Sequence, residues 1–139
     1  MGPILSYPYS AVDSEAVVGF HARGSSRKEK INLNKQTMVF MLHGNKLVGW
    51  DGTGVHEVIS KAARNMYYLS DDKVFFMETH DHQYGQTTVE HSKIKLVECL
   101  FGSFKISKIY EDKDQRAEIL NFGVDNTRER LIVLTGIKN

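Results

Sequence analysis

The sequence predicts a mainly β protein, an antiparallel sandwich or barrel with at most one or two short helices. Short apolar or alternating segments recur at intervals of roughly 8–12 residues, and Gly, Asn, Asp and Ser separate them. About nine to eleven strands result, a number typical of sandwiches and barrels. The chain has 139 residues, of which 41% are hydrophobic and 25% charged, so it can bury one core.

The most strongly marked stretch is Thr37–Trp50, TMVFMLHGNKLVGW. Apolar and β-favouring residues run as far as His43, Gly44-Asn45 follows, and a second apolar run ends at Trp50. A short apolar run that meets a Gly-Asn pair predicts a strand entering a tight hairpin. Glycine at the first central position supplies the positive φ of a type II′ turn.

The N-terminal part is expected to be less regular. Residues 1–14 hold both prolines and are predicted as an arm or edge element, and residues 15–139 as a single β domain. Short strands are predicted at Glu15–Ala22 and Lys30–Leu33. Between them, Arg23–Lys30 is interpreted as a solvated turn, with a phosphate or nucleic-acid contact as the alternative.

The segment Val55–Met66 permits two structures. Its apolar residues recur at helical spacing and Thr53 could cap the first turn, which favours a helix of about three turns. Alternatively Val55–Ser60 is a strand, Lys61–Asn65 a turn and Met66–Ser70 a second strand. The sequence leaves these two possibilities open.

The remainder predicts regular strands joined by polar turns. A polar loop, HDHQYGQ, is expected after the strand Lys73–Thr79, and a charged turn is expected at Glu111–Gln115. The expected strands are Met66–Leu69, Lys73–Thr79, Thr87–His91, Ile94–Phe101, Phe104–Tyr110, Arg116–Val124 and Leu131–Leu134.

Charge and composition exclude several classes of protein. The net charge of +1 gives no basic excess for nucleic acid. No apolar run approaches the roughly 18–20 residues that cross a bilayer, and MGPILSYPYS lacks the features of a secretory signal. We therefore expect a cytoplasmic protein without membrane or direct nucleic-acid contact. The single cysteine, Cys99, lies in the apolar run KLVECLF and is predicted to be buried.

Histidines and carboxylates cluster in one part of the sequence. His80 and His82 are two residues apart, so on a strand they would share a face and could present two imidazoles to one metal. His91 is the candidate third ligand, with Glu78 or Glu90 beside it. The alternative is a solvated hairpin tip with no cofactor.

No motif of a known catalytic type appears, and no catalytic residue is predicted. His43 is interpreted as an inner residue of the hairpin. Trp50, Tyr67 and Phe76 are interpreted as core residues; in a barrel with an open mouth they would instead line an apolar ligand cavity together with His43.

Residues 36–79 resemble the N-terminal sensing domains of AraC-type transcription regulators. The resemblance lies in VFMLHG (Val39–Gly44), KLVGW (Lys46–Trp50) and ARNMYYLSDDKVFFME (Ala63–Glu78). It implies a cupin-like jelly roll that binds a small molecule and forms a homodimer. A metal-binding cupin would carry its glutamate sooner after the His-x-His pair than Glu90, so the resemblance implies a sensing domain more readily than an enzyme. No helix pair is predicted after Val124.

The sequence therefore predicts a ligand-sensing and dimerisation domain of a transcription regulator, more readily a binding protein than an enzyme. The first alternative is a metal-dependent cupin enzyme using the His80–His91 cluster. The second is an interaction protein, of immunity or virion jelly-roll type, which an exposed contiguous apolar patch would support.

Overall fold

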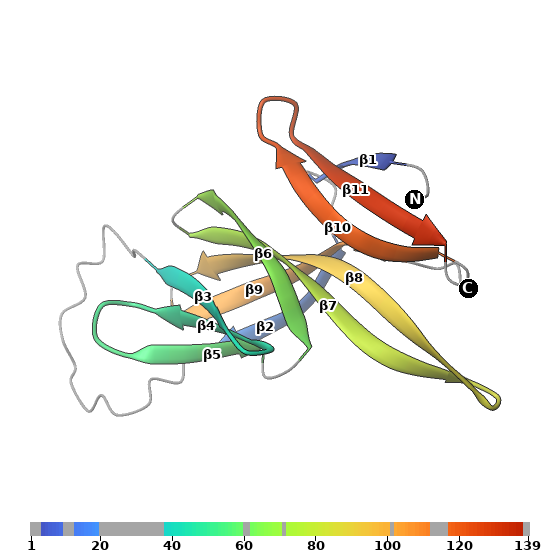
Figure 1. Ribbon diagram of the computed structural model, residues 1–139. Helices are drawn as coiled ribbons and strands as arrows, with labels where there is room; N and C mark the ends of the chain where they lie inside the picture. The colour runs from blue at the N-terminus through green and yellow to red at the C-terminus, as the bar shows by residue number, and fades with distance from the viewer. Residues whose placement is uncertain are drawn as a thin grey trace.

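The computed structural model describes residues 4–9, 13–19, 38–59, 62–70, 72–100, 102–111 and 117–137. Throughout these ranges the regular structure is β and the strand pairing is antiparallel, with no helix, so the mainly β antiparallel class is confirmed. The strands (Figure 1) are β1 (Ile4–Pro8), β2 (Asp13–Gly19), β3 (Val39–His43), β4 (Lys46–Trp50), β5 (Val55–Ile59), β6 (Ala63–Ser70), β7 (Lys73–Tyr84), β8 (Thr87–Leu100), β9 (Ser103–Glu111), β10 (Ala117–Asp125) and β11 (Arg130–Ile137).

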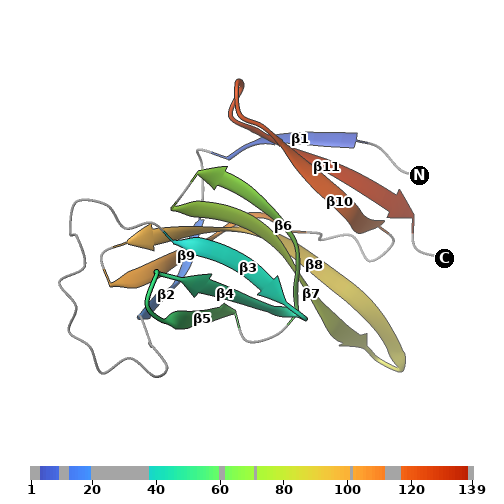
Figure 2. The same cartoon turned by 60° about the vertical axis from the view of Figure 1, so that its left-hand side comes forward.

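The strands form three sheets in three layers. The central sheet has the order β2-β9-β8-β7-β6. One of its faces carries the hairpin sheet, β3-β4-β5, and the other carries the terminal sheet, β1-β11-β10 (Figure 2). As in a jelly roll or barrel, the strands are antiparallel and the sheets are stacked. The strands that the structure describes do not form a closed barrel.

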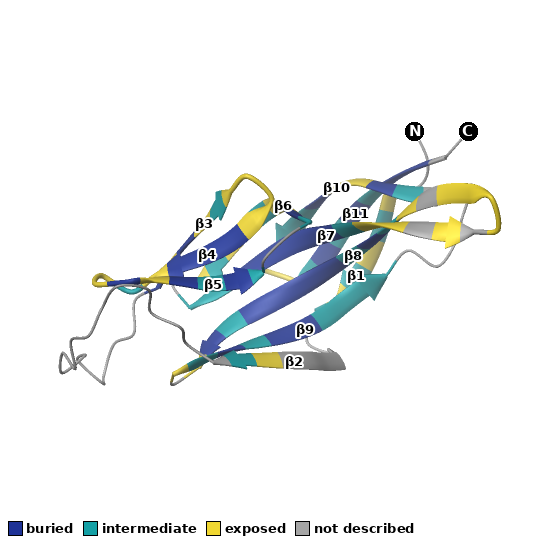
Figure 3. Cartoon of the chain, turned by 90° about the horizontal axis from the view of Figure 1, so that it is seen from below, coloured by how far each residue is buried: buried dark blue, intermediate teal, exposed yellow. Residues whose placement is uncertain are grey.

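The centre of the molecule is the start of β7. Four consecutive side chains, Val74, Phe75, Phe76 and Met77, are completely buried. Successive strand residues point to opposite faces, so Val74 and Phe76 pack under the hairpin sheet while Phe75 and Met77 pack under the terminal sheet. The middle of β7 and β8 is accordingly the most buried part of the central sheet (Figure 3).

Each outer sheet contributes one apolar face to this centre. Under the hairpin sheet, Phe40 and Leu47 pack with Phe104 of β9. Under the terminal sheet, Phe122 and Leu131 pack with residues of β7 and β8. The two cores are separate, and the central sheet is their common wall.

The predicted hairpin at Thr37–Trp50 is confirmed. β3 and β4 pair from Val39 with Trp50 to His43 with Lys46. Gly44 has φ 63° and no atom lies within 4 Å of the position of a Cβ there, so the backbone angle, not space, requires glycine. Gly49 is different, because a Cβ there would lie 2.8 Å from the Met38 sulfur.

The open choice at Val55–Met66 is decided in favour of two strands. β5 covers Val55–Ile59 and β6 begins at Ala63, without the predicted helix. Ala62 and Asn65 adopt positive φ, at 68° and 54°, and a helix does not tolerate such angles. Partnership with β4 and β7 therefore outweighs the helical spacing of the apolar residues.

The prediction of a loop at HDHQYGQ is wrong. β7 continues to Tyr84 and β8 begins at Thr87, so only Gly85-Gln86 form the turn. Residues 79–84 and 87–92 pair only with each other in the ladders described, beyond the last rungs of β6 and β9, and we name them the ribbon. Both faces of a two-stranded ribbon can be wet, so no hydrophobic alternation marks it in the sequence.

The predicted edge element lies on the terminal sheet. β1 is an edge strand paired with β11, and Pro8 ends it, where a missing N–H costs little. Arg130 holds it by donating from Nε to the Ser6 hydroxyl at 2.8 Å and from Nη2 to the Ser6 carbonyl at 2.8 Å. The predicted turn at Arg23–Lys30 and strand at Lys30–Leu33 lie outside the described residues.

The turn between β4 and β5 is organised by Asp51. Its Oδ1 accepts hydrogen bonds from the backbone N–H groups of Thr53 at 2.8 Å and Gly54 at 2.7 Å, and its Oδ2 lies 2.7 Å from Nε2 of His56. Burial raises the pKa of the Asp51 carboxyl, but the hydrogen bonds from His56, Gly54 and Thr53 outweigh it and hold the pKa well below its ordinary value. The ionised carboxylate is therefore part of the folded turn.

We expect the stability that Asp51 contributes to be present above about pH 4, its unfolded pKa, and to be lost as pH falls toward its lower folded pKa. Asp51→Asn should cost about 1–2 kcal/mol at pH 7 and less at pH 3. Urea unfolding of both proteins at the two pH values measures this. An equal difference at both pH values would show that the charge of Asp51 does not matter.

Candidate functional site

A polar cluster follows directly after the buried centre of β7. The face of β7 that carries Val74 and Phe76 continues with Glu78, which is still buried, and then with His80, which is partly exposed. The same face of β8 carries Lys95, Lys93 and His91, and the adjoining part of β9 carries Lys108 and Glu111. We name these seven residues the polar cluster.

The first half of the polar cluster is the unit Lys95–Glu78–His80. Lys95 donates from Nζ to both carboxylate oxygens of Glu78, at 3.2 and 3.3 Å, and both side chains are nearly buried. Nε2 of His80 lies 2.5 Å from Oε1 of Glu78. Burial raises the pKa of Glu78, but the hydrogen bond from His80 and the charge of Lys95 outweigh it, so the net shift is downward and Glu78 is ionised.

The second half repeats this arrangement as Lys108–Glu111–His91. Lys108 donates from Nζ to Oε2 of Glu111 at 2.8 Å, and Nε2 of His91 lies 2.9 Å from Oε1. The hydrogen bonds from Lys108 and His91 lower the pKa of Glu111 to about 2. Each glutamate therefore joins one lysine to one histidine.

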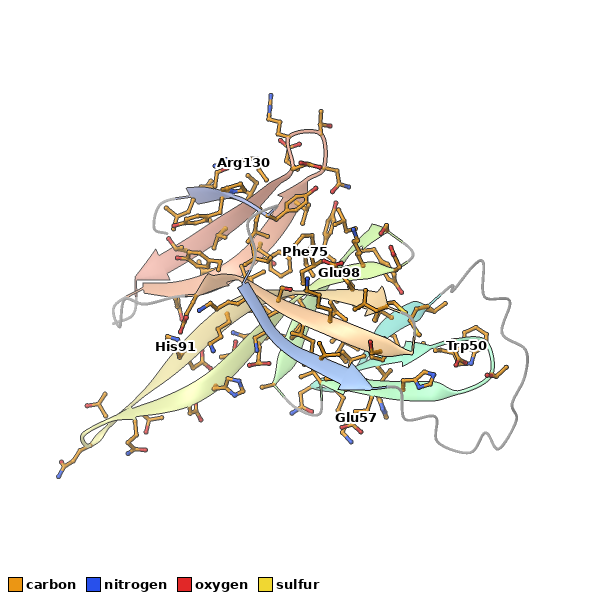
Figure 4. The ribbon with its side chains drawn as sticks, turned by 180° about the vertical axis from the view of Figure 1, so that it is seen from behind. Trp50, Glu57, Phe75, His91, Glu98 and Arg130 are labelled. Carbon is orange, nitrogen blue, oxygen red and sulfur yellow. The ribbon has the colours of Figure 1, made fainter. Side chains whose placement is uncertain are left out.

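The two halves meet at the root of the ribbon. His80 and His91 are direct cross-strand partners, and Glu78 and Glu111 are both partners of Lys93. Cβ atoms of such opposite residues lie about 4.5–5.5 Å apart. Figure 4 shows His91 where β8 runs out into the ribbon, away from Phe75 in the centre.

Chemically, the polar cluster holds two imidazoles whose tautomer is set by carboxylates. A neutral histidine that donates Nε2–H to a glutamate carries its lone pair on Nδ1, and that nitrogen can accept a proton or bind a metal. His80 is more open to solvent than His91, with 43% and 25% of their side chains exposed. The arrangement orients the rings and leaves both accessible.

The structure brings two of the three predicted metal ligands together, His80 and His91. The side chain of His82 lies outside the described residues. Glu90 pairs with Asp81, one position out of phase with His80 and His91, and so lies on the opposite face. Among the side chains that the structure describes, no group of three or more His, Cys, Asp or Glu residues could hold a metal ion.

The four predicted ligand-binding residues lie in different surroundings. Phe76 is fully buried between the central and hairpin sheets. Tyr67 lies across from Phe75 and therefore on the other face of the central sheet. Trp50 and His43 lie on the outer face of the hairpin sheet and are exposed. They do not line one common cavity within the described part of the chain.

The sequence reasoning missed Lys93, Lys95, Lys108 and Glu111 as members of the polar cluster. The lysines of FKISKIY lie on β9, which pairs with a strand on each side in the central sheet. Lys93 and Lys95 are two residues apart with an apolar residue between them, and this alternation could have indicated a strand with one polar face. Their pairing with Glu78 and Glu111 depends on register between strands and has no local signal.

A second exposed feature is apolar. On the outer face of the hairpin sheet, Val39, Trp50 and Val55 form one rung across the three strands. Their exposed fractions are 38%, 42% and 46%, and Met41 in the next rung is 41% exposed. These four residues form what we name the outer face patch; Trp50 lies at its centre, at one end of the sheet (Figure 4).

No family model, no curated protein and no solved structure matches the chain. In the described part of the chain, no helix has the length and apolar character that crossing a bilayer requires.

We expect Lys95→Met to destabilise the protein by about 3–5 kcal/mol, because it leaves the Glu78 carboxylate buried without its cation. The double variant Lys95→Met, Glu78→Met should recover much of that loss, since both charges are then gone. Urea unfolding of the wild type, both single variants and the double variant measures the coupling. Additive effects would show that the two side chains do not act as a pair.

Proposed function

We propose that the chain is a sensing and dimerisation module of the kind found in AraC-type regulators, and that the outer face patch is its dimerisation surface. The observation that carries the dimerisation half is the rung Val39–Trp50–Val55, three apolar side chains exposed side by side. The sensing half is supported by the sequence resemblance over residues 36–79.

The position of the patch favours association over a role in folding. The inner residues of the hairpin sheet, such as Phe40 and Leu47, already cover the central sheet. Val39, Trp50 and Val55 are not part of that core, and a contiguous exposed apolar patch commonly marks a protein contact. Tryptophan is also the residue type most enriched among those that dominate binding energy at interfaces.

The rim of the patch is polar, as interfaces generally are. His43 and Lys46 lie at the other end of the same outer face, and Glu57 is the neighbour of Val48. An apolar centre with charged residues at one side would let a second copy bury Trp50 while keeping the charges in water.

Trp50→Glu should prevent self-association, because it places a carboxylate in the centre of the proposed contact. We expect sedimentation equilibrium to give a dimer dissociation constant at least tenfold higher than that of the wild type. Val17→Glu is the matched control: Val17 is 66% exposed on β2 of the central sheet, away from the patch.

Two outcomes would contradict the dimerisation half. The wild type would remain monomeric at about 100 µM, a concentration at which even a weak specific dimer is populated. Alternatively, Trp50→Glu and Val17→Glu would weaken the dimer equally.

The sensing half predicts that a small molecule raises the melting temperature, since a ligand that binds only the folded state stabilises it. A thermal-shift screen of the full chain against small metabolites measures this. A screen in which no chemical class shifts the melting temperature would remove the sensing half and leave the dimerisation half standing.

A further inference from the structure

We propose that Met41 is an oxidation site through which hydrogen peroxide or an organic hydroperoxide weakens the proposed dimer. This inference rests on the dimerisation half of the proposed function and adds a means of regulating it. The outer face patch is then a contact whose strength depends on the redox state of one thioether.

The first argument is the accessibility of Met41. The structure describes four methionine side chains. Met38 and Met77 are buried, and Met66 is partly buried against the core under the hairpin sheet. Met41 is 41% exposed. Because a peroxide in solution has to reach the sulfur, Met41 should be oxidised before the other three.

The second argument is the position of Met41 in the outer face patch. Met41 lies two residues after Val39 on β3, so both point to the outer face of the hairpin sheet. Val39 is directly opposite Trp50, which makes Met41 a diagonal neighbour of Trp50. Such neighbours lie roughly 7–8 Å apart, within reach of long and aromatic side chains. A contact that buries Trp50 therefore also covers Met41.

The third argument is the chemistry of the thioether. Its sulfur attacks one oxygen of hydrogen peroxide, an S–O bond forms and the O–O bond breaks. The leaving hydroxide takes up the proton of the transferred oxygen and departs as water. The sulfur is oxidised by two electrons and the peroxide is reduced by two. The product, methionine sulfoxide, is polar and chiral, and sulfoxide reductases convert it back to the thioether.

Oxidation of Met41 acts on the contact through desolvation. In the monomer, water can hydrogen-bond the sulfoxide oxygen, whereas an apolar contact removes that water without supplying a donor. In a two-fold symmetric dimer both copies present the same patch, so the contact contains two sulfoxides. The monomer is also the form in which Met41 is open to the peroxide. Oxidation therefore draws the equilibrium toward the monomer.

Treatment of the full chain with hydrogen peroxide, followed by peptide mass mapping and sedimentation equilibrium, tests the proposal. We expect Met41 to gain an oxygen atom before Met38, Met66 and Met77 do. The dimer dissociation constant should then rise about tenfold or more. A methionine sulfoxide reductase should return it to its starting value.

Two leucine variants separate Met41 from the other methionines, since leucine has a similar volume and cannot be oxidised. The dissociation constant of Met41→Leu should be the same before and after peroxide. Met66→Leu, outside the patch, should remain as sensitive to peroxide as the wild type. The melting temperature of each protein, before and after treatment, shows whether it is folded.

The outcomes distinguish this inference from the proposal on which it rests. A wild type that is monomeric before oxidation would overturn the dimerisation half and this inference with it. A folded wild-type dimer that keeps its dissociation constant when Met41 is fully converted to the sulfoxide would overturn this inference alone. So would a Met41→Leu dimer that is as sensitive to peroxide as the wild type.

Discussion

The two-sided burial of β7 is the constraint on which the rest of the structure depends. Val74 to Met77 are fully buried, two under each outer sheet. At about 1.5–3 kcal/mol for each side chain, they contribute roughly 6–12 kcal/mol, as much as the net stability of a typical domain. Both outer sheets pack against this strand and its neighbours in the central sheet, so its two faces take part in both cores.

The polar cluster arises where that burial ends. Glu78 is the first polar residue after the buried four and still lies under partial cover, with 8% exposure. A carboxylate in such a place needs a cation and further hydrogen bonds, and Lys95 and His80 supply them. Beyond Glu78, β7 and β8 continue as the ribbon. His80 and His91 lie at its start, and their side chains are accessible to solvent.

How much the sequence could predict follows from the range of each interaction. The β3–β4 hairpin was predictable because Gly44 encodes its own turn. The choice between helix and strands at Val55–Met66 was not predictable, because the pairing of β5 and β6 with other strands overrides the helical spacing of the local sequence. Glu111 could not be joined to His91 from the sequence, because twenty residues separate them and only the β8–β9 register brings them together.

The outer face patch differs from the buried centre of β7 and from the polar cluster, since none of the core packing among the described residues requires it. Outer positions of the hairpin sheet alternate with those that cover the core, and polar residues there would leave Phe40 and Leu47 in place. His43, Lys46 and Glu57 are such residues on the same face. Within the described residues, apolar side chains at Val39, Trp50 and Val55 therefore reduce solubility without a gain in packing. The proposed dimer contact would bury them, which gives a physical reason for apolar side chains at these positions.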